Sequence, residues 1–167
     1  MRYRVRPAAA ALVLLLTGCT QYYDLVAGKE GDSIVFFPGN WGGWSDPGCV
    51  RQVAVTPVAP DEDVMGVGVD GSGLESAPVW SQEVPPEACS ATFPLAYGQA
   101  LGAAGEGAPP PPPPPPLVPG QPYMVHIITE GPDFGSGLFV IDAQGQVKNL
   151  DSAELVSAPL AQASEAR

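Results

Sequence analysis

The chain has 167 residues and a formal net charge of −11, with 18 acidic residues against seven basic ones. This length is enough for one domain with a hydrophobic core. Because so acidic a chain repels phosphate backbones and anionic lipid head groups, a nucleic-acid partner is excluded.

The N-terminus has the layout of a secretory signal. Three arginines near the start form a positive segment, and the apolar residues 8–16 follow them. This apolar run is too short to cross a hydrocarbon core of about 30 Å as a helix. Small residues then lead into Cys19. Residues 1–18 are therefore predicted to be a signal peptide that is removed.

The four residues Leu16-Thr17-Gly18-Cys19 resemble the lipobox of bacterial lipoproteins. The resemblance implies cleavage before Cys19, a diacylglyceryl group on the Cys19 sulfur and a further acyl chain, such as palmitate, on the new N-terminus. Stable anchoring takes at least two lipid signals, so such a chain would be held at a membrane. In lipoproteins of Gram-negative bacteria, an aspartate directly after the lipidated cysteine implies retention at the inner membrane. This chain has Thr20 at that position, so the resemblance implies the periplasmic side of the outer membrane. The alternative is an ordinary secretory signal with an accidental cysteine.

The polar, mixed residues 19–32 predict a lipidated tether, and residues 33–150 are expected to form the domain. The β-branched and aromatic run 33–37 predicts a first strand, and residues 49–56 alternate as a half-buried strand does. Further strands are predicted at residues 64–69, 77–84, 89–97, 123–130, 138–142 and 146–150. Residues 133–137 are predicted to be a hairpin connection, and residues 151–167 a C-terminal tail.

Short strands with turn signals and no helical period predict an all-β domain, namely an antiparallel β-sandwich of seven to eight strands. The segment LVPGQPYMVHI (residues 117–127) resembles the late strands of immunoglobulin and fibronectin type III domains. In those domains a leucine, proline-glycine and tyrosine lead into the penultimate strand. Two features depart from that pattern: the short interval between Cys49 and Cys89, and a proline-rich loop. Neither resemblance identifies a specific functional family.

Residues 102–120 are predicted to be a proline-rich loop inserted between two strands. Its centre, Pro109–Pro116, is a run of eight prolines that favours polyproline II. The loop is expected to be stiff and exposed. Recognition by an SH3- or EVH1-type partner is the alternative, although the basic neighbours that orient such ligands are absent.

Cys49 and Cys89 are the thiols that remain once Cys19 carries lipid. An oxidising compartment favours their pairing, and the bridge would contribute about 4 kcal/mol. A catalytic thiol is the competing hypothesis. It needs a base, and the chain has a single histidine, His126.

His126 lies in the middle of a predicted strand and is expected to have a structural role. A Ser-His-Asp hydrolase would need it beside an activated serine, and no G-x-S-x-G motif is present. Zinc would require more His or Cys ligands than the chain offers. Asp61, Asp63 and Asp70 are weak Ca²⁺ candidates, but the EF-hand spacing fails, and a solvated acidic loop is predicted instead.

Trp41 and Trp44 flank two glycines in a turn-rich loop ahead of Cys49. They are predicted either to pack over the disulfide or to form a flat surface for sugars or partner proteins.

Together these features predict a membrane-anchored cell-envelope lipoprotein with a non-catalytic structural or protein-interaction domain and an unidentified envelope partner. No cofactor is expected apart from the covalent lipid on Cys19. The alternative is a ligand-binding lipoprotein that recognises a glycan or Ca²⁺, and a third hypothesis is a small envelope hydrolase.

Overall fold

The computed structural model describes residues 22–39, 48–59, 74–102, 112–131 and 133–151. In these ranges the chain is all-β, which confirms the predicted class. The elements are β1 (Tyr22–Glu30), β2 (Ser33–Pro38), β3 (Val50–Pro57), β4 (Trp80–Glu83), the 3₁₀ turn η2 (Pro86–Ala88), β5 (Leu95–Ala96), β6 (Pro122–Thr129), β7 (Phe134–Ile141) and β8 (Val147–Leu150). Within the described ranges, no helix has the length and apolar character needed to cross a membrane.

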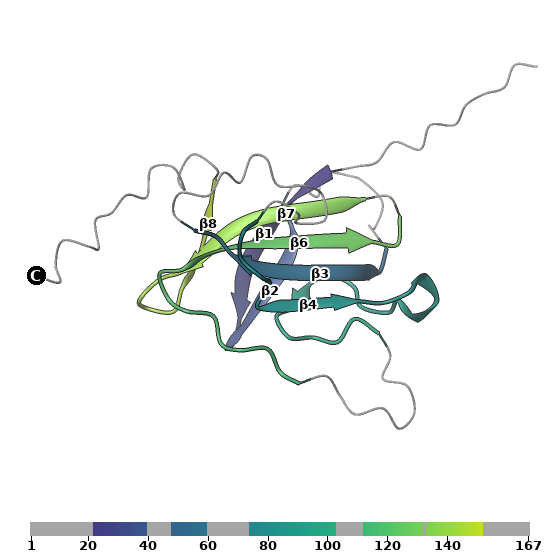
Figure 1. The fold of residues 1–167 in the computed structure, drawn as a ribbon, viewed down its shortest axis with the longest axis horizontal. Helices are drawn as coiled ribbons and strands as arrows, with labels where there is room; N and C mark the ends of the chain where they lie inside the picture. The colour runs from purple at the N-terminus through teal and green to yellow at the C-terminus, as the bar shows by residue number, and fades with distance from the viewer. Residues whose placement is uncertain (1–21, 40–47, 60–73, 103–111, 132, 152–167) are drawn as a thin grey trace, which may run out of the picture.

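The strands follow one hydrogen-bonded path in the order β4-β3-β6-β7-β1-β2-β5, and β8 pairs with β7 off this path (Figure 1). Most neighbouring strands are antiparallel, but β1 and β7 run parallel. The sheet is therefore mixed, and the prediction of a wholly antiparallel arrangement was wrong for this pair. The path is also continuous through β1, so it does not divide clearly into the two separate sheets of the predicted sandwich.

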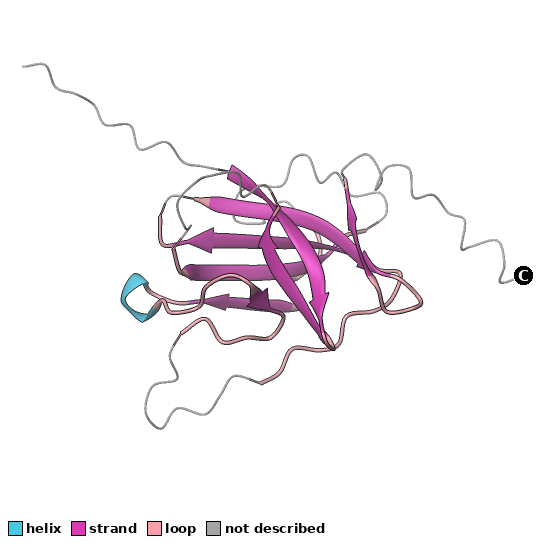
Figure 2. Cartoon of the chain, turned by 180° about the vertical axis from the view of Figure 1, so that it is seen from behind, coloured by secondary structure: helices cyan, strands magenta, loops and turns pink. Residues whose placement is uncertain are grey.

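The sheet curls so that two parts of it, here called arms, face each other across the core. β4, β3, β6 and β7 form one arm, and β1, β2 and β5 form the other. Phe36 of β2 is fully buried, and its ring centroid lies 6.4 Å from that of Trp80 in β4 and 5.6 Å from that of Phe139 in β7. Seen from behind, β1 and β2 cross in front of the strands that include β3 and β6 (Figure 2). The residues between the arms include Leu25, Ala27, Phe36, Val53, Val55, Trp80, Leu95, Val125, Ile127 and Phe139.

The prediction of a tether at residues 19–32 was wrong from Tyr22 onward. Strand β1 begins there, and it lies between β7 and β2 in the sheet. Leu25 and Ala27 point into the core with exposed fractions of 4% and 3%. The hairpin from β1 to β2 turns at Gly31, whose φ of +60° favours glycine. The domain therefore begins about ten residues earlier than its predicted start.

The other predicted strands agree with the structure to different degrees. β2, β3, β6 and β8 lie where the sequence predicted them, within a residue or two at each end. β4 keeps only the second half of its predicted range, and only Leu95–Ala96 remain of the predicted strand at 89–97. Pro94 removes a backbone donor there, which explains the shortening. The predicted strand at 64–69 lies outside the described residues.

Residues 133–137, predicted as a hairpin connection, instead belong largely to strand β7. Their glycines create room for β1. A Cβ atom at Gly137 would collide with the backbone oxygen of Leu25, and one at Gly135 would collide with the ring of Tyr23. The glycines are therefore required by the close approach of β1 to β7, and not by a turn.

Replacing Gly137 by alanine is expected to destabilise the protein by about 1–3 kcal/mol, as overpacking does, because the backbone of β1 must move. Urea denaturation would measure the loss. The matched control is Ser136→Ala, which removes one exposed hydrogen bond and should cost less than about 1 kcal/mol. Equal midpoints for the two variants would contradict the close-approach explanation.

The predicted disulfide is confirmed: Cys49 and Cys89 are bonded, with their Cα atoms 5.8 Å apart. It joins the start of β3 to the segment that follows η2. The backbone N–H of Val50 also donates to the carbonyl of Ala91 at 2.7 Å, and Cys89 forms a β-bridge with Gly102. The covalent bond therefore reinforces a junction that hydrogen bonds already define.

Candidate binding cleft

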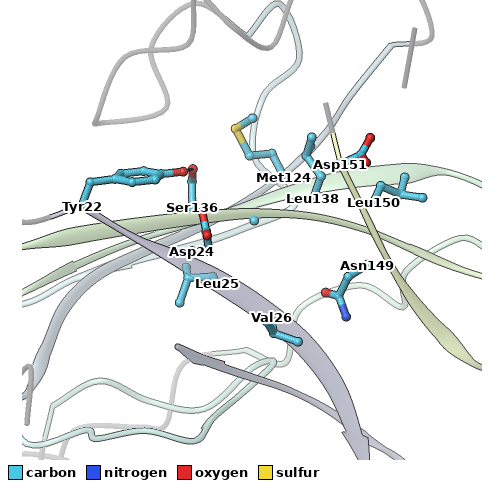
Figure 3. Close-up of a pocket in the computed structure, with 11 residues that line it drawn as sticks. Tyr22, Asp24, Leu25, Val26, Met124, Ser136, Leu138, Asn149, Leu150 and Asp151 are labelled. Carbon is cyan, nitrogen blue, oxygen red and sulfur yellow. Dashed lines mark hydrogen bonds between the residues drawn. The ribbon is translucent and has the colours of Figure 1, made fainter. Parts of the chain in front are cut away.

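A cleft of about 450 Å³ opens where β1 and β8 lie along the same edge of β7. β1 pairs with β7 at residues 134–136, and β8 pairs with it at residues 138–141, so the two strands leave a gap between them. The lining residues are Tyr22, Asp24, Leu25, Val26, Met124, Ser136, Gly137, Leu138, Asn149, Leu150 and Asp151 (Figure 3).

The apolar part of the cleft belongs to a second, smaller hydrophobic cluster. Met124 and Leu138 are 6% and 9% exposed, and they pack with the fully buried Val58. Leu74 and Leu150 are partly buried against them. The side chains that line the cleft are therefore held in place from beneath, as a preformed site requires.

Asn149 fixes the separation of the two walls. Its Oδ1 accepts a hydrogen bond from the backbone N–H of Ala27 at 2.7 Å, and its Nδ2 donates to the Ala27 carbonyl at 2.9 Å. These two bonds occupy the backbone groups of β1 that would otherwise pair with a neighbouring strand. The side chain thus spans the space between β8 and β1.

Besides the Asn149 amide, the polar side chains of the cleft carry hydroxyls or carboxylates. The hydroxyl of Tyr22 is hydrogen-bonded to Ser136 Oγ at 2.8 Å, and the Tyr22 ring meets Phe134 edge to face at 5.4 Å. Asp24 and Asp151 supply carboxylates, and no described lining residue is basic. The cleft therefore suits neutral or cationic groups that carry an apolar part. No sequence motif pointed to it, because its walls come from opposite ends of the domain.

Strand register places Asp24, Ser136 and His126 in one row across β1, β7 and β6. A hydrolytic triad needs a carboxylate that orients the imidazole, which in turn reaches the serine. In this row Ser136 stands between the other two, and its Oγ is hydrogen-bonded to Tyr22. His126 is only 3% exposed, with its ring 6.2 Å from that of Phe134. The row does not have the order of a triad.

Several residues predicted as sites lie outside the described residues: Cys19, Trp41, Trp44, Asp61, Asp63 and Asp70. Their predicted roles in lipidation, surface binding and Ca²⁺ binding remain predictions. Among the residues that the structure does describe, no group of three or more His, Cys, Asp or Glu side chains could hold a metal ion.

The described part of the proline-rich loop is largely exposed, as the sequence predicted, but one side of it rests on the domain. Pro114 and Leu117 are half-buried, whereas the residues around them are exposed. The hydroxyl of Tyr97 donates a hydrogen bond to the Pro115 carbonyl at 2.9 Å. Tyr97 itself meets Trp80 edge to face at 5.1 Å. This end of the loop is therefore attached to the core through an aromatic pair.

Alkaline solution is expected to weaken the fold. Burial, with a smaller effect of Tyr123, raises the pKa of Tyr97 to about 12 from its ordinary 10. Burial, helped by the charge of Asp133, likewise raises the pKa of Tyr23 above its usual range. The folded state therefore retains these protons after the unfolded state has lost them, so the stability present below pH 10 is lost as the pH rises toward 12.

Urea midpoints measured from about pH 9 to about pH 12, a range that spans the ordinary tyrosine pKa of about 10, would test this. Tyr97→Phe should show a shallower decline than the wild type. If the urea midpoint of Tyr97→Phe fell as steeply with pH as that of the wild type, groups other than Tyr97 would cause the loss of stability.

No family model matches the chain, and neither does any curated protein or any solved structure. The basis for a function is therefore the chain's own sequence and geometry.

Proposed function

We propose that this chain is a lipid-anchored cell-envelope lipoprotein whose β domain acts as a non-catalytic interaction module close to the membrane. The lipobox resemblance supplies the anchor at Cys19, and the absence of an aspartate at position 20 favours the periplasmic side of the outer membrane. The partner is a protein of the same compartment.

The start of β1 carries this proposal. Tyr22 begins the strand only three residues after Cys19, a distance that an extended chain spans in at most about 11 Å. An acylated Cys19 would therefore hold the domain against the lipid head groups, without a long tether. Tyr22 is 57% exposed, and a tyrosine at such a place suits the boundary between lipid and water.

A non-catalytic role is supported by the packing of His126. The side chain lies in the middle of β6, opposite Ala54 of β3 and Ser136 of β7. At 3% exposure its imidazole has little surface to offer a substrate. The residue contributes instead to the face of the sheet that carries Met124.

Lipidation can be tested by growing expressing cells with radiolabelled palmitate. The wild-type chain should incorporate label and sediment with membranes, and Cys19→Ala should do neither, because it lacks the sulfur that receives diacylglycerol. Cys49→Ala is the matched control and should keep the label. Label in Cys19→Ala, or none in the wild type, would overturn the anchor.

Ligand binding in the cleft is a second candidate function, favoured by the combination of Tyr22 with Asp24. An aromatic ring beside a carboxylate can bind the apolar face and the hydroxyls of a sugar. Calorimetric titration with cell-wall oligosaccharides should show saturable binding in the wild type and none in Tyr22→Ala. A rise in melting temperature with added Ca²⁺ would instead support the calcium hypothesis for Asp61, Asp63 and Asp70.

A further inference from the structure

The docked part of the proline-rich loop, residues 112–118, has a burial pattern with a period of three. Pro114 and Leu117 are half-buried, and the residues between and beside them are exposed. Leu117 packs against the main core. A polyproline II helix has three residues per turn, so Pro114 and Leu117 lie in the same row along its surface. One of the three rows therefore faces the domain.

Three contacts hold the segment 112–118 against the domain, two of them through its backbone. The Tyr97 hydroxyl donates to the Pro115 carbonyl at 2.9 Å, and the backbone N–H of Val118 donates to the Tyr123 hydroxyl at 2.9 Å. Gly98 has a φ of +86°, and a Cβ atom there would lie 2.8 Å from Pro114 Cδ. Glycine at this position thus lets the proline ring rest on the backbone.

The other two rows are exposed. Pro112, Pro115 and Val118 form one, and Pro113 and Pro116 form the other. Val118 is 60% exposed, the largest value among the exposed large hydrophobic side chains of the described residues. We infer that these two rows, here called the proline ridge, are a docking surface for a partner protein whose groove is lined by Trp and Tyr rings.

The geometry of polyproline recognition supports this partner chemistry. Aromatic-lined grooves bind proline-rich segments in the polyproline II form, and such a groove can grip two rows while the third points away. Here the third row already rests on the domain. The ridge is also fixed before binding, so less conformational entropy is lost on association than for a free peptide. The domain also fixes the direction in which the proline ridge is presented to a partner. A basic residue beside the prolines is therefore not needed to set the direction of binding.

This inference rests on the proposed role as an interaction module, but it does not depend on the lipid. It can be tested with detergent-solubilised full-length protein and, as probe, an isolated WW domain that accepts uncharged polyproline. Calorimetric titration should give saturable binding, and a decaproline peptide should compete for the probe.

The ridge variant is Pro113→Ala/Pro116→Ala, which removes the rings of one exposed row. We expect its Kd to rise by about tenfold or more, as for loss of an interface's central contacts. The control is Pro85→Ala/Pro86→Ala, which removes two exposed prolines elsewhere and should leave the Kd within about twofold. Melting temperatures would verify that both variants fold.

Binding that is equal in the wild type and the ridge variant, or absent from both, would overturn the proline ridge. The palmitate-labelling experiment does not depend on this binding. The lipid anchor and the proline ridge can therefore be refuted independently. Loss of binding in the control variant alone would also contradict the inference, since it would place the contact near η2.

Discussion

Replacing Cys49 and Cys89 by serine is expected to lower the free energy of unfolding by about 4 kcal/mol. The cysteines are 40 residues apart in sequence, and the bond restricts the unfolded chain across that whole interval. The native junction should survive without it, because Val50 and Ala91 remain hydrogen-bonded. Urea denaturation of the oxidised protein and of the double variant measures the difference.

Reduction by dithiothreitol is the internal control for this experiment. It should destabilise the wild type by a similar amount and leave the double variant unchanged. A loss under about 1 kcal/mol would mean that the unfolded chain is already compact across this interval, against the chain-entropy account.

Truncating Phe36 to alanine is expected to cost about 3–5 kcal/mol. The ring is fully buried and contacts both Trp80 and Phe139, so it joins β2 to the opposite arm of the sheet. Its loss leaves a cavity between the arms that the surrounding strands can fill only in part. Thermal and urea denaturation would both register the change.

Phe37→Ala is the matched control, since the neighbouring ring is 38% exposed on the other side of the same strand. It should cost less than Phe36→Ala, because more than a third of the Phe37 side chain already faces solvent and its removal leaves no enclosed cavity. Similar losses for the two variants would show that Phe36 does not join the arms of the curled sheet.

Local patterns in the sequence predicted much of the fold. The runs rich in β-branched and aromatic residues at β2, β3 and β6 predict strands, and the structure forms them. β3 buries Val53 and Val55 on one face, whereas β6 is buried on both faces along most of its length. The disulfide was predicted from two cysteines in a chain with a predicted secretory signal, and the structure confirms the pair.

The remaining differences depend on contacts between distant segments. β1 has mixed composition, and only its place beside β7 makes Leu25 and Ala27 core residues. Gly135 and Gly137 signal a turn when read locally, but they accommodate the strand that crosses them. The cleft has no local signal at all, since β1 and β8 meet only after folding. The packing of Pro114 against Gly98 likewise has no local signal, because the two residues come together only in the folded chain.

The parallel pairing of β1 with β7 has a consequence for biogenesis. Tyr22 and Ser136 are 114 residues apart, so the first strand to leave the ribosome has to wait for almost the last one. Until then β1 can form only its hairpin with β2, and its other edge stays open. Contacts so distant in sequence slow folding and prolong exposure of unpaired edges. A chain built in this way cannot complete its sheet until nearly all of it has been synthesised.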